Sequence, residues 1–374
     1  MTAIAAVLGA VLAIYLAGPR LSAYAEHLAD RFGIQHALGG AVFLGMTTSL
    51  SGTVVSVTAA ARGDASLAIS NGLGGIAAQT VFLAIADFFH RRANLEHDAV
   101  SVANIFQGCL LVLLLGSVMV AFTGPEFSLL GVHPVSILLP LLWAGGTLLA
   151  YRTGESSPWT VPVKPRPAAR HAPDAGDSPA RTRSLGAVLP RFVLFALVVG
   201  GAGFALSRYT PSLTDRMGLS RSAAGFLITA TATSLPELVT TVAAVRRGAL
   251  TLAVGNIVGG NAFDILFCSL SDAVYRDGSI YHAVSGNERL VASLGIVMST
   301  LLLLGLVGRE RHGIARIGTE SLLMILTYIL GVVLIVANQN GPDAPGQGER
   351  PDGPNARPRA PAPSPRQDRP VMER

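Results

Sequence analysis

Long apolar runs divide this chain from one end to the other, and they limit it to very few folds. Each run has about 18–25 residues, the length that a helix needs to cross a bilayer. Only 14% of the residues are charged and the mean hydropathy is +0.50, whereas a soluble domain carries about 25% charged residues. We therefore predict an all-α polytopic membrane protein with about ten transmembrane helices. The predicted spans are residues 1–19, 37–61, 65–89, 99–122, 132–151, 185–206, 221–245, 249–271, 287–308 and 317–337.

The arginines between the spans predict how the chain crosses the membrane. With the N-terminus outside, roughly 16 basic residues fall in cytoplasmic segments and roughly 6 in short external loops, as the positive-inside rule requires. The first run has no basic residue before it and is longer than the apolar core of a signal peptide, so we expect it to be retained. The net charge is +5, and the basic residues lie in loops and in the tail with no aromatic residues between them. This pattern does not indicate nucleic-acid binding. We expect a multi-pass protein of the cell membrane, with the lipid bilayer as its surroundings; the sequence leaves the oligomeric state open.

Two polar segments interrupt and follow the apolar runs. Residues 152–184 and 339–374 are rich in proline and in charged residues, and segments of this composition cannot bury enough apolar surface to become ordered. We expect a disordered cytoplasmic linker at 152–184 and a disordered tail at 339–374. Residues 1–151 and 185–338 then form two membrane halves.

The two halves repeat one another. The segment TSLPELV at 233–239 matches TSLSGTV at 48–54, and this offset of about 185 residues holds along both halves. About 16 of 40 positions are identical between 48–87 and 233–272, including polar and helix-breaking residues that chance similarity does not explain. The shared residues of this kind are Thr48/Thr233, Ser49/Ser234, Arg62/Arg247, Gly63/Gly248, Asn71/Asn256, Gly74/Gly259, Gly75/Gly260 and Asp87/Asp272.

The number of spans in each half predicts how the copies are related. About five spans fall in each half, and an odd number forces the second copy to enter the membrane upside down. The fold class is therefore two inverted five-helix repeats of about ten helices in total. Secondary transporters built in this way bind their substrate near the middle of the membrane, between the repeats.

The span at 221–245 carries a glutamate that needs a reason to be there. Pro236 removes a backbone donor, so the carbonyls near Ala230 and Ala232 are expected to lose their helical partners. Thr233 and Ser234 lie at this break, and Glu237 follows it. Carbonyl, hydroxyl and carboxylate oxygens together suit a hard cation such as Na⁺ or Ca²⁺. An ionisable residue at membrane depth indicates a functional site.

The next span, with the segment GNIVGGNAFDILF, carries a second acid. Gly255, Gly259 and Gly260 permit a helix break or the close approach of another helix. Asn256 and Asn261 offer amide oxygens, and Asp264 shares a helical face with Asn261.

The segments TATSLPELVTT and GNIVGGNAFDILF together resemble the signature repeat of the sodium/calcium exchanger superfamily of cation exchangers. The resemblance covers nearly all predicted spans in order, and it implies two inverted halves whose broken second and third helices surround the ion sites. It also implies a long, tilted first and sixth span that slide to switch access. We expect these spans, 1–19 and 185–206, to be apolar, smooth and free of proline. The implied ligands are Thr233, Ser234, Glu237, Asp264 and the backbone of Ala230, with Thr48, Ser49, Gln79 and the backbone of Gly45 in the first repeat.

The first repeat departs from the pattern that the resemblance implies. Ser51 and Gly52 stand where a proline–glutamate pair is usual, Ile76 replaces an asparagine, and Gln79 stands opposite Asp264. The second repeat has Gly260 where a serine is common. Two carboxylates neutralise one Ca²⁺ or two monovalent ions. Binding more cations at once would leave a net positive charge in a medium of low dielectric constant. We therefore expect an altered stoichiometry, with Glu237 taking up a proton when the cation leaves.

The sequence predicts a secondary-active antiporter that moves Ca²⁺ or another cation against Na⁺ or H⁺ by alternating access. The alternative is a transport-inactive or regulatory membrane protein that keeps the exchanger fold. No resident cofactor is expected and inorganic cations are the expected partners. The sequence has no GxSxG, HExxH or P-loop motif, which disfavours an enzyme and favours transport driven by ion gradients. Asp87 and Asp272, at equivalent span ends, are expected to bond loop arginines; the alternative is that they are vestibule groups or proton acceptors.

Overall fold

A computed structural model of the chain describes residues 2–31, 45–88, 95, 99–129, 131–156, 185–246, 248–308 and 318–338. Most of the predicted linker at 152–184 and the whole predicted tail at 339–374 lie outside these residues. The described regular elements are helices, and the first residues of several of them are capped by side chains. Asp64, Ser101 and Ser220, for example, each accept a bond from a backbone N–H of the first turn.

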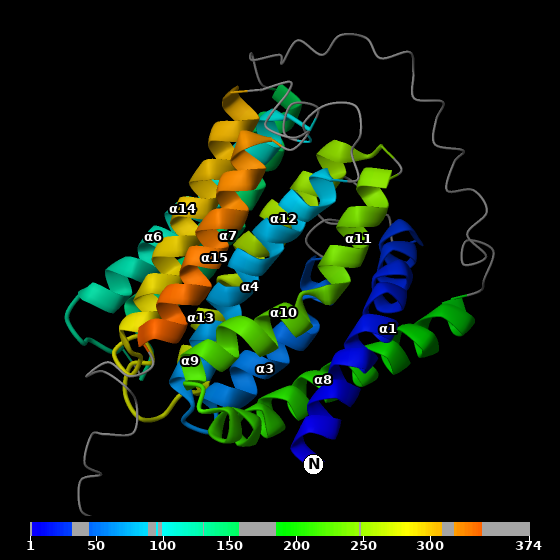
Figure 1. Cartoon of the computed structure of the whole chain (residues 1–374). Coiled ribbons are helices and arrows are strands. Elements are labelled where there is room, and N and C mark those ends of the chain that lie inside the picture. Colours follow the sequence, from blue (N-terminus) through cyan, green and yellow to red (C-terminus); the bar gives the residue numbers. More distant parts are fainter. Residues whose placement is uncertain are drawn as a thin grey trace, which may run out of the picture.

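The helices follow one another in the order that the apolar runs predict (Figure 1). They are α1 (Thr2–Arg31), α3 (Leu50–Ala60), α4 (Ala65–Asp87), α6 (Val102–Thr123), α7 (Pro134–Ser156), α8 (Leu185–Met217), α9 (Arg221–Ala224), the π-helix η1 (Gly225–Thr229), α10 (Ala230–Thr233), α11 (Leu235–Arg246), α12 (Leu250–Asp264), α13 (Leu266–Val274), α14 (Gly286–Gly308) and α15 (Thr319–Ala337).

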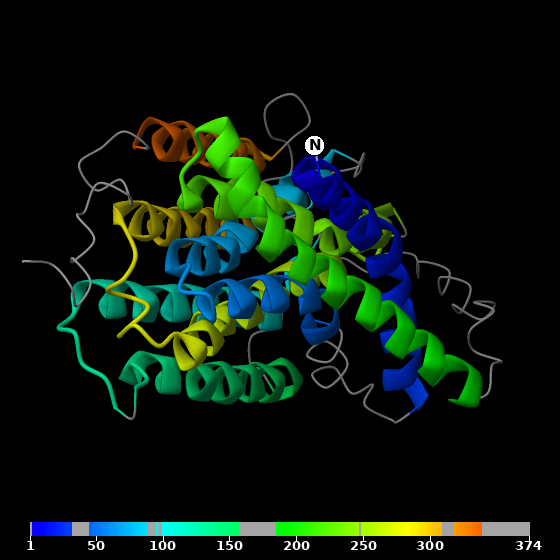
Figure 2. The same cartoon turned by 90° about the horizontal axis from the view of Figure 1, so that it is seen from below.

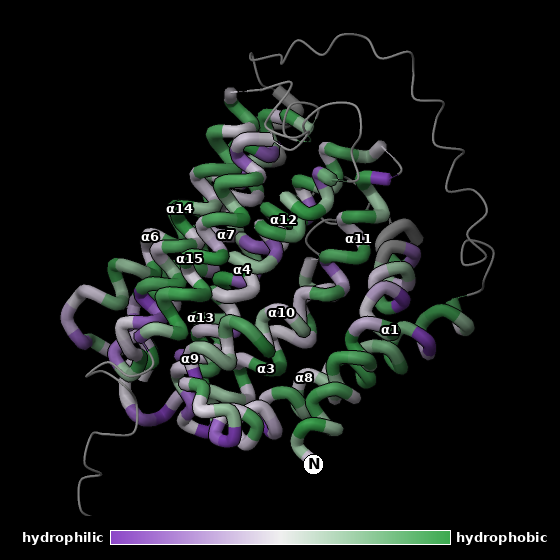
Figure 3. The backbone as a smooth tube through the Cα atoms, in the orientation of Figure 1, coloured by the Kyte–Doolittle hydropathy of each residue, from purple (hydrophilic) through white to green (hydrophobic). Residues whose placement is uncertain are grey.

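The described helices account for most of the predicted membrane spans. Seven are long and apolar enough to cross a bilayer, and Arg221–Thr233 with Leu235–Arg246 forms an eighth that is bent by 48°. Two further apolar helices, Leu50–Ala60 and Pro134–Ala150, are shorter. The predicted span at 37–61 is only partly described, because residues 32–44 lie outside. Apolar residues run along the helices, and hydrophilic ones gather mainly at their ends and in the loops (Figure 3). The chain is therefore an all-helical membrane protein.

Helices α1 and α8 pack against each other and lie to one side of the other helices (Figures 1 and 2). Both extend about three turns beyond their predicted ends at residues 19 and 206. The expectation that these spans are free of proline is wrong, because Pro19 lies inside α1 and Pro190 and Pro211 lie inside α8.

The contacts of α1 and α8 with the remaining helices obey the repeat. Gly18 of α1 lies so close to the ring of Pro236 that a Cβ atom would overlap it. Gly203, which matches Gly18 in the repeat, lies against the backbone of Ser51, with 2.6 Å between a built Cβ and the Ser51 carbonyl oxygen. Ser51 is in turn the repeat counterpart of Pro236. A glycine on each long helix therefore lets that helix pack closely against the helix break in the opposite half.

Helix α4 forms the centre of the molecule, and 22 of its 23 residues are buried. It contacts α3, α11, α12, α14 and α15. Helix α4 and the α12–α13 segment run in opposite directions (Figure 1), as the inverted repeat requires. These two segments carry Gln79 and Asp264, so the pairing of the halves brings both residues to the middle of the fold.

Asp87 and Asp272 show the repeat in four hydrogen bonds. Asp87 accepts from the N–H of Leu95 at 2.8 Å and of Gly318 at 3.1 Å. Asp272 accepts from the N–H of Ile280 at 3.2 Å and of His133 at 2.7 Å. Leu95 and Ile280 are 185 residues apart, and so are His133 and Gly318. Each acid therefore accepts one bond from the residue directly before the last helix of the opposite half.

We call these bonds the Asp87 link and the Asp272 link. The expectation that loop arginines bond these acids is wrong for Asp272, because among the described residues its carboxylate is held by backbone N–H groups. A backbone donor at a helix N-terminus favours a carboxylate without any side-chain cation.

Candidate functional site

Two helix breaks form the frame of the candidate site. Ser234, with φ −93° and ψ 5°, separates α10 from α11. Ser49, with φ −79° and ψ 5°, precedes α3 in nearly the same conformation. Pro236 explains the break in the second repeat, since it has no N–H to continue the helical ladder. The break in the first repeat has Ser51 at the corresponding position, and its hydroxyl donates to the Thr233 carbonyl at 3.2 Å.

A small space, which we call the central cavity, lies between the two breaks. Its volume is about 10 Å³, which holds about one water molecule. Residues from both repeats line it: Ser49, Gly52, Asn71, Gly75 and Gln79 from the first, and Thr233, Ser234, Glu237, Asp264 and Phe267 from the second. The structure thus brings together six of the predicted site residues, namely Ser49, Gln79, Thr233, Ser234, Glu237 and Asp264.

Asp264 is bonded by the opposite repeat. The hydroxyl of Ser49 donates to Oδ1 at 2.6 Å, and Nε2 of Gln79 donates to Oδ2 at 2.6 Å. Gln79 is the repeat counterpart of Asp264, so this bond crosses the pseudo-twofold axis between the halves. The Asp264 side chain is therefore oriented by two short bonds, as a ligand needs to be.

Glu237 is buried in the same cavity and is less completely bonded. Only 2% of the residue is exposed, Thr48 lies close enough to its carboxylate to interact with it, and Oε2 has no partner in the described part of the chain. Glu237 and Asp264 repel each other electrostatically. Two ionised carboxylates in so small and buried a space require a cation or a proton to neutralise them.

Unpartnered oxygen atoms gather around these acids. Oδ1 of Asn71, Oε1 of Gln79 and Oε2 of Glu237 are buried, have no hydrogen-bond partner among the described residues, and belong to residues that line the cavity. Asn71 was not among the predicted ligands. Its presence in both repeats, as Asn71 and Asn256, was the signal that could have found it.

Four predicted site residues lie elsewhere or are already bonded: Asn261, Ala230, Gly45 and Asn256. Asn261 donates to the Ile76 carbonyl at 3.4 Å and to the Thr80 hydroxyl at 3.2 Å, and it does not line the central cavity. The Ala230 carbonyl is not bare, because the Ser234 N–H and the Thr233 hydroxyl both donate to it. The Gly45 carbonyl accepts from the Thr48 hydroxyl and the Ser49 N–H.

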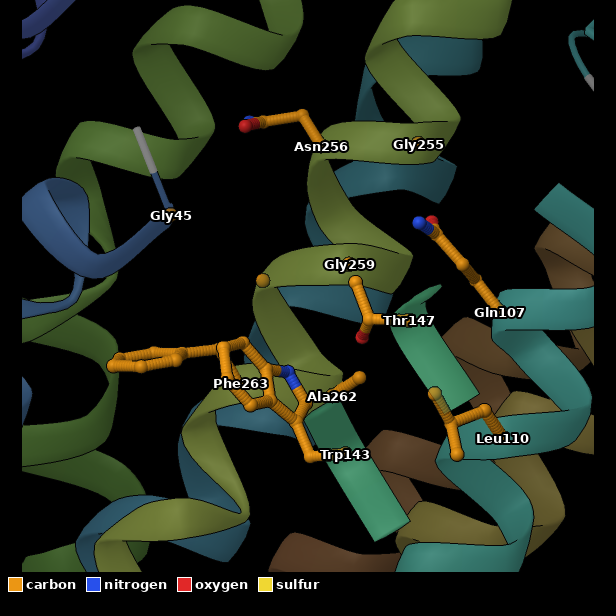
Figure 4. Close-up of a pocket in the computed structure, with 11 residues that line it drawn as sticks. Gly45, Gln107, Leu110, Trp143, Thr147, Gly255, Asn256, Gly259, Ala262 and Phe263 are labelled. Carbon is orange, nitrogen blue, oxygen red and sulfur yellow. The ribbon is translucent and has the colours of Figure 1, made fainter. Parts of the chain in front are cut away.

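Gly45 and Asn256 instead line a second space, the side cavity, with a volume of about 30 Å³ (Figure 4). Asn256 and Gly45 lie on one side of α12 and Gln107 on the other, while the rings of Trp143 and Phe263 pack edge to face, 5.6 Å apart. Gly260 lines the side cavity, and a Cβ built on it would lie 3.5 Å from the free Oε1 of Gln79. The side cavity therefore adjoins the central cavity at Gly260, and Asn256 lines only the side cavity.

The oxygen atoms of the central cavity determine its chemistry. Among the described residues, no group of three or more His, Cys, Asp or Glu side chains could hold a metal ion by itself. The two carboxylates are supplemented by hydroxyl and amide oxygens, a donor set that suits hard cations.

These features define a class of protein: a helical membrane protein of two inverted repeats, with broken helices around a buried cavity that contains acids. A family model for the sodium/calcium exchanger protein matches residues 2–152 and 188–337, and the chain belongs to this family of membrane transporters.

Comparisons with individual proteins agree with this assignment. The chain is 28% identical over 334 residues to "Putative antiporter CaxA" of Alkalimonas amylolytica, covering 86% of this chain and 94% of that protein. It is 27% identical over 297 residues to inner membrane protein YrbG of Escherichia coli (strain K12), covering 79% and 86% of the two chains. The crystal structure of the H⁺/Ca²⁺ exchanger CAX is similar, with a TM-score of 0.63 and 15% identity over 90% of this chain and 85% of CAX. At that identity the similarity demonstrates a shared fold.

Proposed function

We propose that this protein is a secondary-active antiporter that exchanges Ca²⁺ or another cation for Na⁺ or H⁺. The observation that carries the proposal is that Glu237 and Asp264 line one buried cavity between the repeats, beside hydroxyl and amide oxygens. The ligands that we propose around the cation are Glu237, Asp264, Ser49, Ser234, Gln79 and Asn71.

The charge of the cavity limits what it can carry. Two carboxylates neutralise one divalent cation or two monovalent ones, and an unbalanced charge at this depth would be costly. The free Oε2 of Glu237 offers a place for a proton when the cation leaves. The name of the relative CaxA and the H⁺/Ca²⁺ exchange named for CAX support a cation exchanged against an ion gradient.

The contacts of α1 and α8 support a mechanism of alternating access. Gly18 and Gly203 allow these helices to pass the breaks at Pro236 and Ser51 at close range. Movement of the helix pair past the breaks would open the cavity to one side and then to the other. We place the protein in the cell membrane with its N-terminus outside and residues 152–184 in the cytoplasm, joining the halves 1–151 and 185–338.

The test is uptake of labelled Ca²⁺ into proteoliposomes under an imposed Na⁺ or proton gradient. Wild-type protein should take up Ca²⁺ with one of the two gradients, and Glu237→Gln should abolish that uptake. Glu288→Gln is the matched control, because Glu288 is also a fully buried glutamate but is bonded by Ser70, Ser222 and Ser285 outside the cavity. Uptake that survives Glu237→Gln would contradict the proposal.

One observation favours a second candidate, a transport-inactive or regulatory protein with the exchanger fold. Position 52 of the first repeat is glycine, so the counterpart of Glu237 is missing. A protein of this kind would show no cation flux under either gradient, and Glu237→Gln would leave its behaviour unchanged.

A further inference from the structure

We propose that Phe267 determines the specificity of the central cavity by occupying the space of the carboxylate that the first repeat lacks. The inference rests on the proposed function, since it names the residue that limits how much positive charge the site accepts.

The ring of Phe267 covers Gly52 directly. A Cβ atom built on Gly52 would lie 2.8 Å from Cε2 and 3.2 Å from Cζ of the ring. Real Cβ atoms essentially never approach another atom to 2.8 Å. Any side chain at position 52 therefore requires the ring to move.

The repeat shows where a carboxylate at position 52 would point. The Glu237 carboxylate lies close enough to Thr48 to interact with it. Thr233 is the counterpart of Thr48, and the Cβ built on Gly52 would lie 3.7 Å from its Oγ1. An acid at position 52 would thus reach the equivalent threonine of the other half, through the space that the ring now fills.

The ring is held firmly in that place. Phe267 is 3% exposed and packs edge to face on Phe263, with ring centroids 6.2 Å apart. A Cβ built on Gly72 would lie only 3.3 Å from Cβ and 3.4 Å from Cδ2 of Phe267. Closely packed interiors resist the displacement of an aromatic ring. The ring therefore acts as part of the cavity wall.

An apolar wall in place of a third acid changes the ion that the cavity selects. Glu237 and Asp264 remain the acids that line the cavity in the described part of the chain. The site can neutralise one divalent cation or two monovalent ones, and the ring provides no oxygen to replace lost water. Binding more positive charge in the cavity requires both a new acid at position 52 and the removal of the ring.

The experiment compares Gly52→Glu, Phe267→Ala and the double variant in purified full-length protein. Binding of labelled Ca²⁺ in detergent and the melting temperature are measured for each, with Phe267→Leu as a milder variant if Phe267→Ala does not fold. Gly52→Glu alone should lower the melting temperature without strengthening Ca²⁺ binding. In the Phe267→Ala background the same substitution should strengthen binding about tenfold, the coupling expected between residues in contact.

Phe82→Ala is the matched control, because Phe82 is the buried repeat counterpart of Phe267. It should not rescue Gly52→Glu. Additive effects of positions 52 and 267, or equal rescue by Phe82→Ala, would overturn the inference.

The outcomes separate the inference from the proposed function. A wild-type protein that binds and transports no cation would contradict the proposed function, whereas the melting temperatures alone decide whether Phe267 excludes a side chain at position 52.

Discussion

The two helix breaks of this protein have nearly the same backbone but different chemistry. Ser49 and Ser234 adopt similar dihedral angles and both border the central cavity. Three residues later the first repeat has Gly52, under an aromatic ring, and the second has Glu237, with a free carboxylate oxygen. The break therefore persists without the acid and without the proline. The fold therefore determines the geometry of the break, whereas the acid serves the proposed binding of a cation.

The first break is held by contacts that replace the missing proline. The Ser51 hydroxyl donates to the Thr233 carbonyl in the other break, and the Thr53 N–H donates to the Ser49 carbonyl at 2.9 Å, which resumes the helix. Gly203 lets α8 lie against the Ser51 backbone. One break is thus caused by its own sequence and the other by its neighbours, so the two halves should respond differently to substitution.

The largest effect is expected when the Asp264 carboxylate is moved across the pseudo-twofold axis. Asp264→Gln should reduce Ca²⁺ exchange in proteoliposomes about 100-fold, because one of two buried charges is lost. Adding Gln79→Asp should restore exchange to within about tenfold of wild type, since the new acid occupies the equivalent position. A double variant as inactive as the single one would show that the halves are not interchangeable here.

A smaller effect is expected where α1 and α8 pass the breaks. Gly203→Ala should destabilise the protein by about 1–3 kcal/mol and slow exchange, because the new methyl group meets the Ser51 backbone. Gly18→Ala should act more weakly, because the ring of Pro236 can yield more easily than backbone. Gly201→Ala is the control, since nothing lies within 4 Å of a Cβ there. Equal effects of all three substitutions on exchange rates and melting temperatures would refute this difference.

The sequence predicted the repeat and the meeting of Glu237 with Asp264 because both depend on helix order and helix breaks. It did not predict Phe267 as part of the site, since an apolar residue in an apolar helix carries no signal of its neighbour. The amide nitrogen of Asn261 donates to the Thr80 hydroxyl, a contact that the shared helical face with Asp264 did not indicate.

The free carbonyl expected at Ala230 fails for a local reason. Threonine in a helix can bond the carbonyl three or four residues before it, and Thr233 does so with Ala230 and Thr229. The ordinary helical donor is also present, because Ser234, four residues after Ala230, donates its N–H to the Ala230 carbonyl at 3.1 Å. The missing N–H of Pro236 affects the carbonyl of Ala232 instead.

The Asp87 and Asp272 links test whether the halves are mechanically equivalent. Asp272→Asn should destabilise the protein by about 1–3 kcal/mol, because the amide can accept from only one of the two backbone donors in good geometry. Asp87→Asn should have a similar effect, as the links match across the repeat. Thermal unfolding in detergent measures both, with the exposed Asp277→Asn as control. A large effect of only one link would show that the core is held mainly at one face.

The smallest effect is expected at the repeated asparagines, and it distinguishes the two cavities. Asn71 lines the central cavity with an unpartnered Oδ1, whereas Asn256 lines the side cavity. Asn71→Ala should weaken Ca²⁺ binding several-fold, about the value of one hydrogen bond or amide ligand, and Asn256→Ala should weaken it less. Because Asn71 also donates to the Gly52 carbonyl at 3.1 Å and to Ser56 at 2.9 Å, binding must be measured on variants that melt near the wild-type temperature. A stronger effect of Asn256→Ala would move the cation towards the side cavity.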